Sequence, residues 1–208
     1  MVIDILKGTN RIKPIFIQDD KIRLIRDDSN NSIFIKETQA DAKLKKVTIS
    51  DFSTSTVGIK MDAYGKNICN FFNKSTENIN KGSDALIYTE CVGDLYKNSA
   101  FLNKKYILII DLKSNDPKGF HLQMKSTKAF TQYVKAILNE FFQPNDINEY
   151  ELIFVLFSSE RKIKTYTQRK NNKYGRVERI NGFKYLNCYA LGHNYDFHLK
   201  KIIENYCV

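Results

Sequence analysis

The feature that most constrains the fold is an apolar run from Tyr106 to Ile110 that leads directly into Asp111, Leu112 and Lys113. A continuous apolar run of this length is typical of a strand buried on both faces, as in a sheet covered by helices. Because side chains alternate along a strand, Asp111 and Lys113 point to the same face at its carboxyl end. Taken alone, this end is either a place to hold a metal and polarise a water or an ordinary buried strand with an exposed polar end.

A second strand is predicted from Asp84 to Glu90, and it begins with an acid. A turn-rich connection that includes Gly93 joins it to the apolar run, and two strands joined in this way form an antiparallel hairpin. The start of the first strand then lies beside the end of the second, so Asp84, Asp111 and Lys113 converge on one edge. Two carboxylates with a nearby lysine suit a hard cation such as Mg²⁺ and a water that the lysine positions or deprotonates.

The next elements predict a βαβ unit. Apolar residues recur with helical spacing from His121 to Phe142, and a buried strand is predicted at Leu152 to Phe157, parallel to the apolar run. Gln123 falls in the first turn of the helix, at the end nearest Lys113. The stripe expected to pack against the sheet comprises Ala129, Phe130, Tyr133, Val134, Ile137, Leu138 and Phe141.

The remaining segments complete an α/β protein with a mixed β-sheet core flanked by helices. Short β-rich runs separated by polar turns predict an antiparallel meander over residues 1–50, and we expect an N-terminal β-rich extension at 1–55 before a core at 56–208. Within the core, a strand is also predicted at Val57 to Asp62, a half-buried strand at Phe183 to Tyr189, and a short helix at Asp196 to Tyr206.

The charge balance favours a polyanionic partner. The chain carries 33 Lys and Arg against 23 Asp and Glu, a formal net charge of +10, and nucleic acid is the commonest partner of such proteins. A lysine-rich composition also occurs where genomes are AT-rich. Residues 158–182 are polar and basic, and they form either a solvated surface loop or a phosphate-contact surface. The candidates for nucleic-acid contacts are Lys162, Lys164, Arg169, Lys170, Lys173 and Arg176.

Several other classes of protein are disfavoured. No apolar run reaches transmembrane length, and the segment Met1 to Lys7 is too short and too charged for a signal peptide, so we expect a cytoplasmic protein with no membrane partner. The cysteines are scattered without a C-x-x-C pair, which disfavours a zinc site or a disulfide framework. They are Cys69, Cys91, Cys188 and Cys207.

An acid at a strand start, followed by Asp111-Leu112-Lys113 at the end of the next strand, resembles the PD-(D/E)xK nuclease superfamily, whose fold is that of many restriction endonucleases. The resemblance covers residues 56–157. It implies that Asp84 and Asp111 bind metal, that Lys113 assists the water, and that Gln123 matches the polar residue some members carry in the following helix. For the further upstream acid it implies a metal ligand at Asp62, which we prefer to Glu77 because Asp62 closes a predicted strand.

The resemblance implies a Mg²⁺-dependent endonuclease, with Mn²⁺ as the alternative ion, that hydrolyses phosphodiester bonds of DNA in restriction or phage defence. RNA stays open as a substrate, and so does a homodimer or a partner subunit. Ser83 stands where the family often has proline, and Asp111 where it more often has glutamate. The alternative function is a catalytically inactive subunit that binds nucleic acid or another protein, because such folds can keep binding after catalysis is lost.

Overall fold

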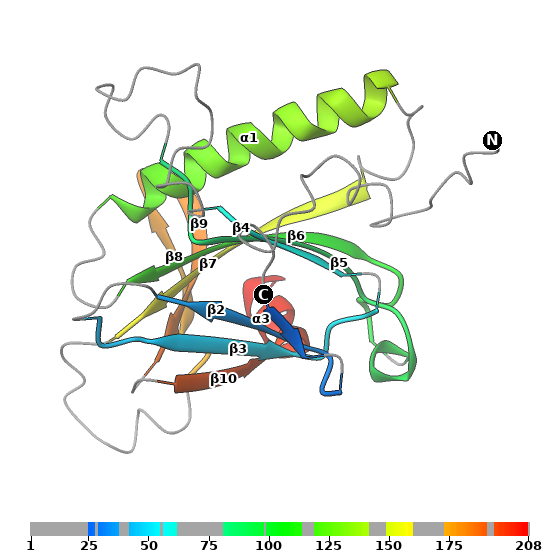
Figure 1. Cartoon of the computed structure of the whole chain (residues 1–208), viewed down its shortest axis with the longest axis horizontal. Helices are drawn as coiled ribbons and strands as arrows, with labels where there is room; N and C mark the ends of the chain where they lie inside the picture. The colour runs from blue at the N-terminus through cyan, green and yellow to red at the C-terminus, as the bar shows by residue number, and fades with distance from the viewer. Residues whose placement is uncertain are drawn as a thin grey trace.

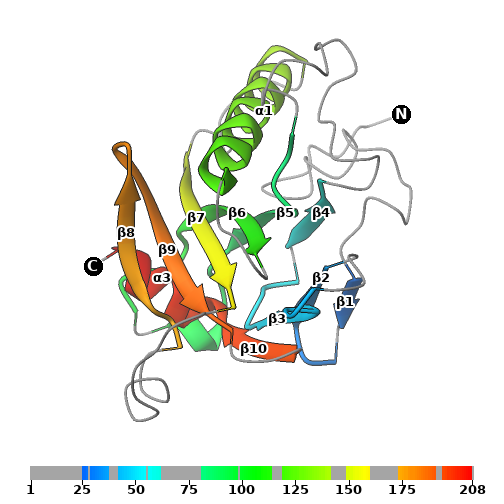
Figure 2. The same ribbon diagram turned by 90° about the vertical axis from the view of Figure 1, so that its left-hand side faces the viewer.

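The computed structural model describes residues 25–27, 29–37, 42–54, 56–61, 81–97, 99–113, 119–141, 149–159, 173–190 and 194–207. These residues form a mixed α/β fold with two β-sheets and two α-helices (Figure 1). Helix α1 covers one face of the larger sheet, and the smaller sheet lies on its other side with α3 between them (Figures 1 and 2). The α/β class with a mixed sheet, expected from the sequence, is confirmed.

The larger sheet has six strands in the order β4-β5-β6-β7-β9-β8 (Figure 2). Its central strands β6 and β7 run parallel, β9 continues parallel to β7, and the outer pairs are antiparallel. The strands are β4 (Val57–Lys60), β5 (Ala85–Glu90), β6 (Lys105–Lys113), β7 (Tyr150–Ser158), β8 (Arg176–Ile180) and β9 (Phe183–Tyr189).

The hairpin and the βαβ unit predicted from the sequence are confirmed. Strands β5 and β6 pair antiparallel across a connection that contains a short 3-10 helix (Asp94–Tyr96). Helix α1 (Phe120–Phe141) then crosses the sheet, and β7 returns parallel to β6. The seven residues Tyr106–Leu112 are all buried, as expected of a central strand with both faces covered.

The buried face of α1 is not the face predicted from the sequence. Its buried residues lie alternately four and three positions apart, and only Val134 and Leu138 belong to the predicted stripe. Tyr133 and Phe141 were expected in the core but are 63% and 74% exposed, and Ala129 is also exposed. The error arises because two threonines occupy core positions, so counting apolar residues alone rotates the predicted face. The buried residues are Phe120, Met124, Thr127, Thr131, Val134 and Leu138.

The smaller sheet joins the two ends of the described chain. Its order is β1-β2-β3-β10, and the predicted antiparallel meander is confirmed for β1 to β3. Strand β10 pairs parallel with β3, although about 145 residues separate them in sequence. The C-terminal helix predicted from residue 196 therefore begins later, after β10. The elements are β1 (Ile25–Asp27), β2 (Ser32–Lys36), β3 (Lys46–Ser50), β10 (Asn194–His198) and α3 (Leu199–Cys207).

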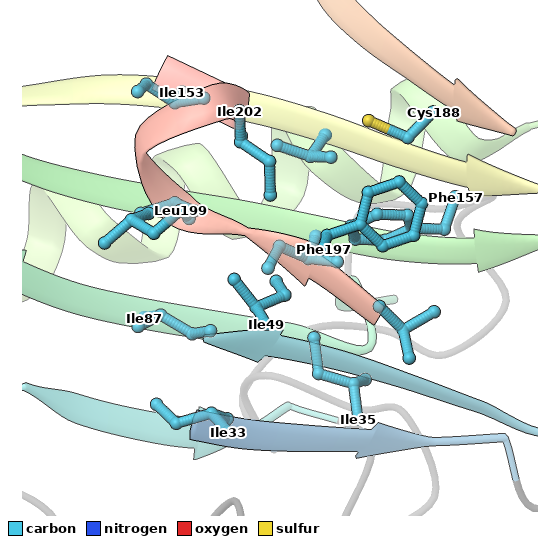
Figure 3. Packing of buried hydrophobic residues seen from close by; sticks show 14 of the residues in the cluster. Ile33, Ile35, Ile49, Ile87, Ile153, Phe157, Cys188, Phe197, Leu199 and Ile202 are labelled. Carbon is cyan, nitrogen blue, oxygen red and sulfur yellow. The ribbon is translucent and has the colours of Figure 1, made fainter. Parts of the chain in front are cut away.

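One hydrophobic cluster fills the space between the two sheets (Figure 3). Phe197 of β10 packs against Phe157 of β7, with ring centroids 4.6 Å apart. Ile33 and Ile49 from the smaller sheet and Ile202 from α3 join the same cluster. Strands β1 to β3 precede residue 55, whereas β10 of the same sheet comes from the C-terminal side of the chain, and Phe197 on it belongs to this core.

The other face of the larger sheet carries a second cluster beneath α1, which includes Ile109, Phe120, Met124 and Tyr185. Part of the segment expected as a basic loop at 158–182 is the edge strand β8, which forms a hairpin with β9. The strand is hard to recognise in the sequence because three of its five residues, Arg176, Glu178 and Arg179, are charged and break the apolar alternation. Neither described helix has the length and hydropathy needed to cross a membrane.

Candidate metal centre

The sheet register places Asp84 opposite Asp111. Ala85 pairs with Ile110 in the antiparallel ladder of β5 and β6. One step further along the same register, Asp84 faces Asp111, and directly opposite residues project from the same side of a sheet. Asp111 and Lys113 lie on the face covered by α1, because Ile109 on the same strand face belongs to the cluster beneath that helix.

Asp111 is a buried acid that forms an ion pair with Lys113. Its side chain is 1% exposed, and Lys113 Nζ lies 3.2 Å from Oδ1. Within the described part of the chain, neither carboxylate oxygen of Asp111 has a partner in hydrogen-bond geometry. Burial, and then repulsion from the Asp84 carboxylate, raise the pKa of Asp111 well above its usual range, while Lys113 acts in the opposite direction. The position therefore favours an additional positive charge.

Two neighbours fix the groups around this acid. Lys113 Nζ donates a 2.8 Å hydrogen bond to Gln123 Oε1 in the first turn of α1, and the Lys113 side chain is only 17% exposed. The backbone N–H of Leu112 donates a 2.6 Å hydrogen bond to Asp84 Oδ2. The structure thus brings together Asp84, Asp111, Lys113 and Gln123, the four residues that the sequence singled out for catalysis.

Thr127 is a supporting residue that sequence reasoning missed. Its hydroxyl oxygen accepts a 2.8 Å hydrogen bond from the backbone N–H of Ser83, the residue before Asp84. Gln123 and Thr127 are four residues apart, so both project from the same side of α1. One helix face therefore holds Lys113 through Gln123 and the start of β5 through Thr127. The sequence signal that could have identified Thr127 is a polar residue at a position where the helix packs against the sheet.

The donor set fits a small hard cation. Carboxylate oxygens are the ligands that Mg²⁺ prefers, and the buried carboxylate of Asp111 lies beside a second acid, Asp84. In the described ranges no group of three or more His, Cys, Asp and Glu side chains gathers around a common point. The predicted third ligand Asp62 and its alternative Glu77 lie outside the described residues. Met61, directly before Asp62, donates its backbone N–H to the carbonyl oxygen of Asp84 at 3.1 Å.

Two of the residues predicted to contact nucleic acid, Lys173 and Arg176, lie in the part of the chain that the structure describes, and their environments differ. Lys173 Nζ donates to the carbonyl oxygen of Asp196 at 2.8 Å and lies 5.2 to 5.8 Å from the centroids of three aromatic rings. The Lys173 ammonium is therefore engaged in contacts within the protein. Arg176, by contrast, has a side chain that is 76% exposed. The other predicted contacts lie outside the described residues: Lys162, Lys164, Arg169 and Lys170.

Arg176 belongs to a polar network that the sequence did not reveal. Its Nε donates to Glu178 Oε1 at 3.2 Å, and the Tyr185 hydroxyl donates to Glu178 Oε2 at 2.7 Å. Asn187 Nδ2 lies 3.4 Å from Glu178 Oε1, and Ser158 Oγ donates to Asn187 Oδ1 at 2.9 Å. Burial would raise the pKa of Glu178, but the hydrogen bonds, chiefly from Tyr185, outweigh it and lower that pKa. The network depends on strand pairing, which the sequence alone does not define.

The elements that carry these residues follow one another along the chain as β5, β6, α1 and β7, with β9 and β8 beyond them in the sheet. The two acids come from β5 and β6, the lysine from β6 and the glutamine from α1. Comparison of the chain with protein-family models, with curated proteins and with solved structures gave no match.

Proposed function

We propose that the protein is a metal-dependent endonuclease of the PD-(D/E)xK kind that hydrolyses phosphodiester bonds of DNA. The single observation that carries the proposal is the placement of Asp84 opposite Asp111, with Lys113 3.2 Å from Asp111. The antiparallel hairpin, the helix and the parallel strand that follow agree with the order of elements in that superfamily. The formal charge of +10 suits a polyanionic substrate.

Asp84 and Asp111 would hold Mg²⁺ or Mn²⁺, with Asp62 as the candidate third ligand. When bound, such an ion lowers the pKa of a coordinated water and neutralises charge on a phosphodiester. Gln123 holds the Lys113 ammonium beside Asp111, where that ammonium can orient a water and stabilise developing negative charge. Thr127 keeps the start of β5 against α1 and thereby maintains the position of the Asp84 carboxylate.

The test is cleavage of supercoiled plasmid DNA in Mg²⁺, compared with EDTA. We expect cleavage by the wild-type protein and its loss in Asp111→Asn and Lys113→Ala, because each removes a group that acts at the scissile phosphate. The matched controls are Asp94→Asn and Lys125→Ala, which remove the same charges from exposed positions. Cleavage that survives both site substitutions would remove the basis of the proposal.

One observation favours a second candidate, a catalytically silent subunit that binds nucleic acid or another protein. Among the described residues no group of three or more His, Cys, Asp and Glu side chains gathers at the acid pair, and burial raises the pKa of Asp111. A protonated Asp111 would serve structure without a metal. This candidate predicts no metal-dependent cleavage at any Mg²⁺ or Mn²⁺ concentration, together with DNA binding that weakens as salt increases.

A further inference from the structure

The register of the larger sheet aligns the acid pair with Arg176. Asp111 pairs with Leu156, Leu156 with Asn187, and Asn187 with Arg176. Directly paired residues on neighbouring strands share one face of a sheet. The side chains of this row therefore lie on the face that α1 covers, and they end at the edge strand β8.

A contact with α1 supports this assignment of the face. Phe120, the first residue of the helix, packs edge-on against Tyr185 with ring centroids 4.8 Å apart. Tyr185 lies two residues before Asn187 on β9, so the two side chains point the same way. On this face the row runs from Asp111 and Leu156, which are buried, to Arg176, which is exposed.

Polar side chains follow the row at the carboxyl end of the parallel strands. Lys113 pairs with Ser158, and Ser158 bonds Asn187, which in turn approaches Glu178. Among the contacts of the described residues, Glu178 accepts a hydrogen bond from Arg176 Nε, and the Arg176 side chain is 76% exposed. An arginine anchored through Nε by an ionised carboxylate is a preorganised donor for a phosphate.

The length of the row suits a nucleic-acid strand. Strand β8 lies three strand spacings from β6, which corresponds to about 14 Å at ~4.8 Å per spacing. A duplex rises ~3.4 Å per nucleotide along its axis, and each strand also winds about that axis, so two phosphates at this distance lie only a few nucleotides apart on one strand. A phosphodiester at the acid pair and a second phosphate at Arg176 are therefore compatible with one continuous backbone.

We propose that Arg176, anchored by Glu178 at the sheet edge, binds a backbone phosphate of the DNA strand whose phosphodiester lies at Asp84 and Asp111, a few nucleotides away. This inference rests on the proposed function, since it uses the acid pair as the place of the reacting bond. Of the basic residues predicted to contact nucleic acid, Arg176 is the one for which we propose a specific contact. Arg176 is then a substrate-binding residue that fixes the register of the strand over the site.

The chain supplies a matched control for this contact. Arg179 lies on the same edge strand and is also exposed, but it is three residues from Arg176 and so projects from the opposite face of the sheet. Arg176→Ala and Arg179→Ala remove the same charge from the same strand. If only the net charge matters, the two variants lose the same DNA affinity. If Arg176 contacts a phosphate, Arg176→Ala loses more affinity than Arg179→Ala.

Fluorescence anisotropy with a labelled DNA duplex in EDTA measures binding without cleavage. We expect Arg176→Ala to weaken binding roughly tenfold, the size of one charge-assisted hydrogen bond. The slope of log K against log salt should decrease by about 0.9 for the loss of one phosphate contact, and Arg179→Ala should change neither quantity. Equal effects of the two variants, or no effect of Arg176→Ala, would overturn the inference.

A second arm locates the contact and defines the substrate. In a series of duplexes, each with one phosphate replaced by a neutral methylphosphonate, we expect one position at which the replacement weakens binding by the wild type. The same replacement should not change binding by Arg176→Ala. The absence of such a position contradicts the inference, as does an Arg176→Ala defect with RNA alone. Plasmid cleavage tests the proposed function separately. If wild-type protein cleaves, Asp111→Asn does not, and the Arg176 and Arg179 variants bind DNA equally well, the phosphate contact is rejected and the nuclease is not. An Arg176-specific defect without any cleavage rejects the nuclease alone.

Discussion

Replacing Asp111 with asparagine should stabilise the metal-free protein, although the substitution removes a central residue of the site. The asparagine side chain has nearly the shape of the acid but no charge, so it relieves the burial cost and the repulsion from Asp84 that raise the pKa of Asp111. Each unit by which the folded-state pKa exceeds the unfolded value corresponds to about 1.4 kcal/mol at a pH where the acid is ionised. Loss of the ion pair with Lys113 offsets part of this gain.

The sign with pH follows from proton linkage. Because the pKa of Asp111 is raised in the folded protein, that state binds more protons than the unfolded chain between the unfolded pKa near 3.9 and the folded pKa. The contribution of Asp111 to stability is therefore fully present below the unfolded pKa and is lost as pH rises through the folded value. The difference in stability between Asp111→Asn and wild type should grow in favour of the variant over the same interval.

Thermal unfolding in EDTA between pH 4 and pH 9 measures this difference. For a chain of this length, 1 kcal/mol corresponds to about 2–4 °C in Tm. Adding Mg²⁺ should reverse the order, because an ion that binds only the folded wild type stabilises it by about 2.7 kcal/mol at a concentration 100 times Kd. Asp94→Asn, at an exposed position, is the control and should change Tm little. A variant less stable than wild type in EDTA at neutral pH would refute this account of Asp111.

Three further predictions concern the supporting structure. Thr127→Val should lower the free energy of unfolding in urea by about 1–3 kcal/mol because a buried backbone N–H loses its acceptor, whereas Thr127→Ser should lose less. Gly175→Ala should lower the free energy of unfolding more than Gly182→Ala. Both glycines have a positive φ, but only at Gly175 would a Cβ lie 1.6 Å from the carbonyl oxygen of Asn187. Equal unfolding midpoints for the two variants would contradict this. Cys207→Ser should remove one fast-reacting thiol in a native thiol titration, since the other described cysteines are buried, and an unchanged fast phase would be the opposing result.

The candidate site could be predicted from the sequence because its signals are local. Asp84 opens a strand, Asp111 and Lys113 close the next one, and a hairpin connection defines their antiparallel pairing. Gln123 follows within ten residues of Lys113, so its contact needs only the position of one helix. The parallel return of the following strand was also predicted correctly, because a helix that crosses the sheet between two strands brings the second strand back parallel to the first.

The errors concern positions where distant pairing or polar core residues decide the structure. Phe197 lies on a strand because β10 pairs with β3 near the other end of the described chain, and no local pattern specifies that partner. Thr127 and Thr131 are buried on α1 because they form hydrogen bonds there, so a search for apolar residues gave the wrong face. Arg176 was grouped with a basic loop because the charges of an edge strand hide its period of two.

A crystal of the protein soaked in Mn²⁺ tests the central claim most directly, because anomalous scattering identifies the ion and its position. The account predicts one peak between Asp84 and Asp111, with at least one carboxylate oxygen of each acid at coordination distance, about 2.1 Å for an ion of this kind. The same soak of Asp111→Asn should show no peak there. A wild-type crystal with no peak at this position, or with an ion bound by only one of the two acids, would contradict the claim that the pair forms a metal centre.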